Sequence, residues 1–238
     1  MDRLSKASRF LDSVRGTDKV FMLIQYVSKI AVWKLKSRHP ESPLAVRIQN
    51  LAAPISDTRV LLRYYGLIPL VRWIIISELD TSTTPVLRWL VRLQNAANLA
   101  YYPLEHIYWL ASHKVISMDA KLREKIGMWS CRFWAAYVVL YFMQLGEEYL
   151  MLGREGAELQ RREAALGDKP SGRETWQLEK RVFEDKKHSW LMNTVINSAY
   201  FPMTIHWSLE NSPISDVSIG VLGTIAALAQ LHMTWRSS

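Results

Sequence analysis

VSIGVLGTIAALAQLHMTW, residues 217–235, decides the fold class of this chain. Its 19 residues carry no formal charge, and Asp216 and Arg236 flank them. About 20 consecutive apolar residues cross the hydrocarbon core of a bilayer as a helix, so the stretch predicts a membrane span. Small residues fall on one strip of that helix, where they let another helix approach closely in lipid. These helix-packing residues are Gly220, Gly223, Thr224 and Ala227.

A second stretch of similar character, residues 126–145, has Arg132 as its only charge. It predicts a second span, with a buried helix of a soluble bundle as the alternative. Between the two spans lies a charged segment, residues 147–187, which we expect to be a soluble loop with helical parts. The uncharged stretch 188–209 contains a proline and is either interfacial, re-entrant or membrane-crossing. The sequence thus predicts an all-α fold in which residues 126–238 form a membrane-embedded region built on a helical hairpin.

The N-terminal half is basic and amphipathic. The chain has a formal net charge of +8, and residues 1–63 hold 12 Lys and Arg against 5 Asp and Glu. Apolar residues recur at helical spacing in residues 2–14 and 18–36, so both stretches predict amphipathic helices. Basic residues interleaved with apolar helical stripes favour an anionic phospholipid membrane or a partner helix over nucleic acid. Residues 1–125 are therefore expected to form a cytosol-facing region of amphipathic helices that binds no nucleic acid.

The segment SDTRVLLRYYGLI, residues 56–68, predicts a short basic amphipathic helix with Ser56 as its N-cap and Pro54 ending the helix before it. At helical spacing its apolar residues share one face, and Arg59 and Arg63 share the other. Such a helix lies in the interface of an anionic membrane or packs on a neighbouring helix. In the first case the two arginines hold lipid headgroups. The membrane-inserting face then consists of Val60, Leu61, Tyr64, Tyr65 and Ile68.

The sequence offers little that points to catalysis. It contains no HExxH, GxSxG or P-loop pattern, and its single cysteine, Cys131, excludes a CxxC metal site. Glu105, His106 and His113 lie on a tyrosine-rich stretch without a further ligand nearby, so packing explains them better than a metal site or an acid–base pair. We therefore expect no enzyme, no catalytic residue, no metal and no cofactor.

The charges around the predicted spans indicate an orientation. Two glutamates follow the first span, and three basic residues precede it, namely Lys121, Arg123 and Lys125. Basic residues favour the cytosolic side of a span, which places the N-terminal half in the cytosol. Arg236 follows the last span and Asp216 precedes it, which places the C-terminus on the same side. A two-span hairpin with both termini in the cytosol satisfies both observations.

Several short motifs occur in a fixed order along most of the chain. They are Asp18-Lys19, Gln25-Tyr26, Ser56-x-x-Arg59 with Arg63, the aromatic stretch 98–110, and the glycine-containing stretch 220–225 with Trp235. In order and spacing these motifs resemble the peroxin eleven family of peroxisomal membrane proteins, and they are similar to its divergent fungal branch.

The resemblance implies a function and partners. Members of that family sit in the peroxisomal membrane, insert amphipathic helices into the cytosolic leaflet, self-associate and assist recruitment of the fission machinery. The implied function is peroxisomal membrane elongation, proliferation and fission by a homo-oligomer whose inserting helix is residues 56–68. A peroxisomal solute channel is the alternative, and its candidate lining residues are Asn193, Asn197 and His206. A soluble helical binding module is the third possibility.

Overall fold

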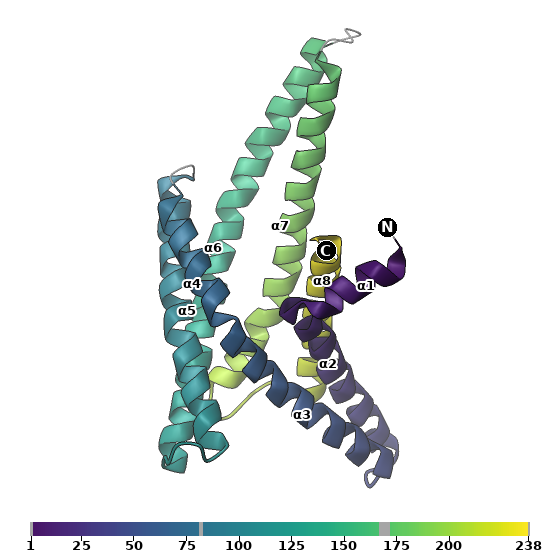
Figure 1. Cartoon of the computed structure of the whole chain (residues 1–238), viewed down its shortest axis with the longest axis vertical. Coiled ribbons are helices and arrows are strands. Elements are labelled where there is room, and N and C mark those ends of the chain that lie inside the picture. The colour runs from purple at the N-terminus through teal and green to yellow at the C-terminus, as the bar shows by residue number, and fades with distance from the viewer. Residues whose placement is uncertain (1, 81–82, 167–171, 238) are drawn as a thin grey trace.

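A computed structural model describes residues 2–80, 83–166 and 172–237. Within these ranges the chain forms eight α-helices and no strand, which confirms the predicted all-α fold (Figure 1). The helices are α1 (Arg3–Asp12), α2 (Val14–Arg38), α3 (Pro43–Tyr65), α4 (Leu67–Leu79), α5 (Pro85–Ser112), α6 (Ala120–Leu166), α7 (Arg173–Ser208) and α8 (Asp216–Ser237).

The longer helices pack in the order α5, α6, α7, α8 and α2, and α3 crosses from α2 toward α5 (Figure 1). The main buried core lies where α2, α7 and α8 meet. Phe10 of α1 packs edge-on against Trp235 with ring centroids 5.4 Å apart, so the first helix lies beside the end of the last one. The core side chains are Met22, Tyr26, Ala199, Met203, Ile219, Ala226 and Ala227.

Among the described residues, two helices are long and apolar enough to cross a membrane, namely α6 and α8. They contain the predicted spans 126–145 and 217–235. The pair α3 and α4, bent by 46° at its break, has the length and composition for one more span. Because α7 lies between α6 and α8 and packs against both, the hairpin partner of α6 is α7.

The segment 147–187, expected to be a loop, is largely helical. Residues 147–166 extend α6 and residues 173–187 begin α7, while 167–171 lie outside the described residues. We call these two helical pieces the charged arm, which projects beyond the other helices (Figure 1). Opposite charges one turn apart and across the helices support helix formation in water, so charge alone does not indicate a loop. Its ion pairs are Arg162–Glu158, Arg162–Glu179 and Lys186–Glu155.

Helix α3 begins earlier than the sequence pattern predicts. Ser42 is its N-cap and accepts a backbone N–H of the first turn. The helix then continues through Pro54 to Tyr65, so Ser56 lies inside a helix and caps nothing. A proline removes one backbone donor from a helix, but the 23 residues of α3 continue on both sides of it. The bend after Tyr65 divides the predicted helix 56–68 between α3 and α4.

Candidate functional site

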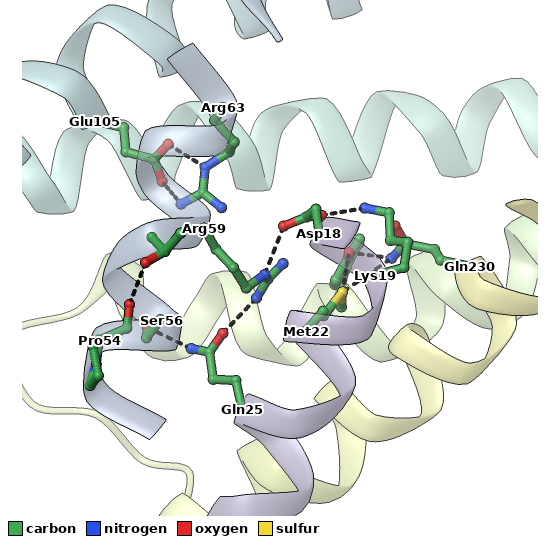
Figure 2. A network of polar contacts seen from close by, with 12 residues as sticks. Asp18, Lys19, Met22, Gln25, Pro54, Ser56, Arg59, Arg63, Glu105 and Gln230 are labelled. Atoms are coloured by element: carbon green, nitrogen blue, oxygen red, sulfur yellow. Dashed lines mark hydrogen bonds and ion pairs between the residues drawn. The ribbon is translucent and has the colours of Figure 1, made fainter. Parts of the chain in front are cut away.

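Arg59 belongs to α3, and its side chain reaches α2, where it binds two side chains (Figure 2). Its Nε donates to Asp18 Oδ1 at 2.9 Å, and its Nη1 donates to Gln25 Oε1 at 2.6 Å. Asp18 and Gln25 share one face of α2 because they are about two helical turns apart. Arg59 is only 8% exposed, so its guanidinium is held inside the protein.

Arg63, one turn further along α3, binds α5 (Figure 2). Its Nε and Nη2 donate to the two oxygens of Glu105, each at 2.6 Å. Tyr101 donates its hydroxyl to Glu105 Oε1 at 2.8 Å. A two-pronged contact between arginine and carboxylate fixes the orientation of both groups and is stronger than a neutral hydrogen bond. The two arginines therefore join α3 to α2 on one side and to α5 on the other.

Further contacts complete this set, which we call the arginine network. Gln25 Nε2 donates to Ser56 Oγ at 2.7 Å, and Lys19 Nζ lies 2.8 Å from Asp18 Oδ2. Burial raises the pKa of the Asp18 carboxyl, but the positive charges of Arg59 and Lys19 outweigh burial and hold that pKa below its ordinary value. The network consists of Asp18, Lys19, Gln25, Ser56, Arg59, Arg63, Tyr101 and Glu105.

The sequence predicted that Arg59 and Arg63 hold lipid headgroups, whereas the structure gives both of them protein partners. Each guanidinium already binds a carboxylate in this structure. The helical pattern correctly places the arginines on one face of α3, but it cannot say whether that face meets lipid or another helix. Asp18 and Glu105 are remote in sequence, so no local pattern reveals them as partners.

The predicted membrane-inserting face is divided as well. Leu61, Tyr65 and Ile68 point outward, and the last two are 72% and 80% exposed. Val60 is half-buried, and Tyr64 stacks on His106 of α5 with ring centroids 3.6 Å apart. Three of the five side chains are therefore exposed, and Tyr64 packs against α5.

Helix α4 exposes apolar side chains along its whole length, and none of its residues is buried. Its charged residues are Arg72 and, near its end, Glu78. Soluble monomers seldom expose a large contiguous apolar patch. The sequence pattern did not predict a role for this helix, although its low charge was the available signal. We call the following set the α3–α4 apolar surface: Leu61, Tyr65, Ile68, Val71, Trp73, Ile75, Ile76 and Leu79.

The small residues of α8 lie against α2. A Cβ atom at position 223 would overlap the ring of Tyr26, and one at position 220 would meet the Tyr26 carbonyl oxygen at 3.2 Å. Ala227 is fully buried in the same core, and Thr224 Oγ1 donates to the Gly220 carbonyl at 2.7 Å. The helix that approaches this strip is thus an N-terminal one, which the sequence did not identify.

The remaining candidate residues from the sequence, considered for a metal site, an acid–base pair or a channel, lie in separate parts of the fold. Glu105 belongs to the arginine network, and His113 Nε2 lies 3.0 Å from Asp57 Oδ2. In the ranges that the structure describes, no group of three or more His, Cys, Asp or Glu is arranged to hold a metal ion. Asn197 is buried and donates to the Asn193 carbonyl of its own helix at 2.8 Å.

The described residues form a helical bundle with two helices that could span a membrane and one helix, α4, that exposes apolar side chains, which is the architecture of a helical membrane protein. The family model for peroxisomal biogenesis factor 11 matches residues 4–235. The chain belongs to this family, and the resemblance predicted from its motifs is confirmed.

Relatives named for the peroxisomal membrane are similar over long stretches. Peroxisomal membrane protein 11C of Homo sapiens is 22% identical over 250 residues, covering 100% of this chain and 96% of the relative. Peroxisomal membrane protein 11B of Arabidopsis thaliana is 29% identical over 132 residues, or 53% of each chain. An uncharacterized protein of Schizosaccharomyces pombe is 24% identical over 231 residues, 97% of this chain and 93% of the relative. No solved structure matches the chain.

Proposed function

We propose that this chain is a peroxisomal membrane protein that promotes elongation, proliferation and fission of the organelle by inserting the α3–α4 apolar surface into the cytosolic leaflet. Membership of the peroxisomal biogenesis factor 11 family supports the organelle and the process. The observation that carries the mechanism is α4, an apolar helix without a single buried residue. Water is a poor solvent for such a surface, and the boundary between headgroups and acyl chains is a good one.

In the proposed mechanism, an apolar surface inserts into the membrane while the helices behind it keep it in a fixed position. Leu61, Tyr65, Ile68 and the outward side chains of α4 enter one leaflet, while Arg59 and Arg63 keep α3 fixed to α2 and α5. Expansion of one leaflet favours curvature of the membrane. In this proposal both termini face the cytosol, an anionic phospholipid membrane is the binding partner, and copies of the chain act together with the fission machinery.

Replacing Tyr65 and Ile68 by glutamate is expected to abolish peroxisome elongation. Burying each such side chain contributes about 1.5–3 kcal/mol, and both glutamates would repel anionic headgroups. Because Tyr65 and Ile68 are 72% and 80% exposed within the protein, the substitutions leave the packing of the bundle intact. The measurement is organelle length in cells that express the full chain, together with its retention after carbonate extraction.

The matched control replaces Leu178 and Val182 by glutamate. These two residues are also apolar and exposed, at 61% and 54%, but they lie on the charged arm. The control variant should elongate peroxisomes as the unchanged protein does. Normal elongation by the Tyr65→Glu, Ile68→Glu variant would overturn the proposed role of this surface.

A further inference from the structure

We infer that residues 190–208 of α7 form a third membrane crossing, whose outer stripe contacts lipid acyl chains, so that the charged arm and the C-terminus emerge on the same side. The two membrane-length helices, α6 and α8, would by themselves give a hairpin with the charged arm opposite the C-terminus. The position of α7 between them is incompatible with that arrangement.

The C-terminal half of α7, residues 190–208, lies alongside the apolar part of α6. Trp190 Nε1 donates to the Leu145 carbonyl at 2.9 Å, where the apolar part of α6 ends. At the other end, Arg132 Nε donates to the Ser208 carbonyl at 3.2 Å. Between these two contacts, aromatic rings meet across the helices, with centroids 5.7 Å apart for Trp134–Trp207 and 5.9 Å for Phe142–Phe201. Residues 190–208 therefore lie at the same depth as the span of α6.

Contacts between α7 and α8 show in the same way that these two helices lie side by side. Arg236 Nη2 donates to Asp185 Oδ1 at 2.6 Å, which puts the end of α8 beside the base of the charged arm. Met203 shares a buried core with Ile219 near the start of α8. Helices α6 and α8 consequently run in the same direction, with α7 antiparallel to both (Figure 1). If α6 and α8 cross the membrane, α7 crosses it between them.

The composition of α7 fits a crossing that is mostly covered by protein. Residues 188–209 carry no Asp, Glu, Lys or Arg. Four polar side chains of this part of α7 are bonded within the helix, which removes their need for water. The bonds run from Thr194 to the Trp190 carbonyl, from Asn197 to that of Asn193, from Thr204 to that of Phe201, and from Ser208 to that of Thr204.

The exposed side chains of this part of α7 form one narrow stripe. At helical spacing they fall on a single face, and all but the serine are large and apolar. They are Leu191, Ser198, Phe201 and Ile205. Comparable stripes on the neighbouring spans contain Val139 and Met143 of α6 and Val221, Ile225 and Leu228 of α8. A window average of hydropathy counts the polar side chains of α7 although they are packed inside the bundle, so it misses a crossing that exposes only this stripe to lipid.

Sidedness follows from the count of crossings. Three crossings place residues 209–215 and the start of α6 on one side, and the charged arm and the C-terminus on the other. With the termini in the cytosol, an assignment that rests on the proposed function, the charged arm is cytosolic. Lys121, Arg123 and Lys125 then lie in the lumen, in contrast to the orientation that their charge predicted. Because the N-terminus is also cytosolic in the proposed function, the chain must then cross the membrane an odd number of times before residue 121.

The test uses the full chain with Cys131→Ala, which removes the only cysteine. Single cysteines are introduced at four places, namely Lys121→Cys, Glu163→Cys, Asn211→Cys and a cysteine added after Ser238. Intact peroxisomes are treated with a membrane-impermeant maleimide before and after detergent. The cysteine-free variant is the labelling control, and detergent should make all four sites reactive.

Three crossings predict that position 163 and the C-terminus react alike, and that positions 121 and 211 react alike and oppositely to the first two. A two-crossing hairpin predicts a different pairing, with 121 and the C-terminus on one side and 163 and 211 on the other. That pairing, or reaction of all four sites in intact organelles, would overturn the inference. Organelle length measured in the same cells tests the proposed function separately, because labelling does not depend on elongation.

Discussion

Reversing the charge of Arg63 alone, by Arg63→Glu, is expected to destabilise the bundle, and adding Glu105→Arg should restore much of the loss. The single change places two carboxylates where a two-pronged ion pair stood at 2.6 Å. The side chains of Arg63 and Glu105 are only 27% and 14% exposed, so water compensates poorly. Breaking a buried pair by removing one partner costs about 3–5 kcal/mol, and we expect the lower end of that range here.

Thermal unfolding of the purified full chain in detergent measures this effect. The matched control is Arg92→Glu, which breaks an ion pair with Glu78 whose side chains are 39% and 37% exposed. Exposed pairs contribute about 0–1 kcal/mol, so the control should shift the melting temperature little. Equal losses from Arg63→Glu and Arg92→Glu, or no recovery in the double variant, would contradict the role assigned to the Arg63–Glu105 pair.

Local sequence was sufficient to predict both of the membrane-length helices found among the described residues, α6 and α8. The stretches 126–145 and 217–235 are long and nearly free of charge, and both properties can be read within one window. The same reasoning left 188–209 open between an interfacial, a re-entrant and a membrane-crossing segment. In the crossing that we propose, this segment packs against α6 and α8 and exposes only a narrow apolar stripe. The mean hydropathy of a segment depends only on its composition, and a central helix can carry polar residues on the faces that other helices cover.

The arginine network could not be predicted for a different reason. Helical spacing places Arg59 and Arg63 together, and a basic face opposite an apolar one is what a membrane-surface helix looks like. Which face turns inward depends on Asp18 and Glu105, which lie 41 and 42 positions away from their arginines. The short motifs were nevertheless informative, because most of them meet in one place. Asp18, Gln25, Ser56 and Arg59 come from separate motifs of the sequence and are joined by hydrogen bonds in the fold. Arg63 binds Glu105 one turn further along α3.

Replacing Gly223 by leucine is expected to separate α2 from α8 and to cause a large loss of packing. A side chain at this position would overlap the ring of Tyr26, which is 5% exposed and belongs to the main core. Overpacking of a core costs about 1–3 kcal/mol and occasionally more. Because Tyr26 adjoins Arg59, at 5.9 Å from its ring centroid, displacement of the ring should also disturb the arginine network.

Melting temperature in detergent and the rate of tryptic cleavage within α2 measure the Gly223→Leu effect. Gly153→Leu is the matched control, since position 153 is helical and nothing lies within 4 Å of a Cβ built there. That control should be neutral or slightly stabilising, because glycine is about 1 kcal/mol less favourable than alanine or leucine in a helix interior. Adding Tyr26→Ala to Gly223→Leu removes the overlapping ring, so the two losses should not add. Strict additivity of the pair would mean that residue 223 acts through a neighbour other than Tyr26, and the close approach of α2 to α8 would not depend on this glycine.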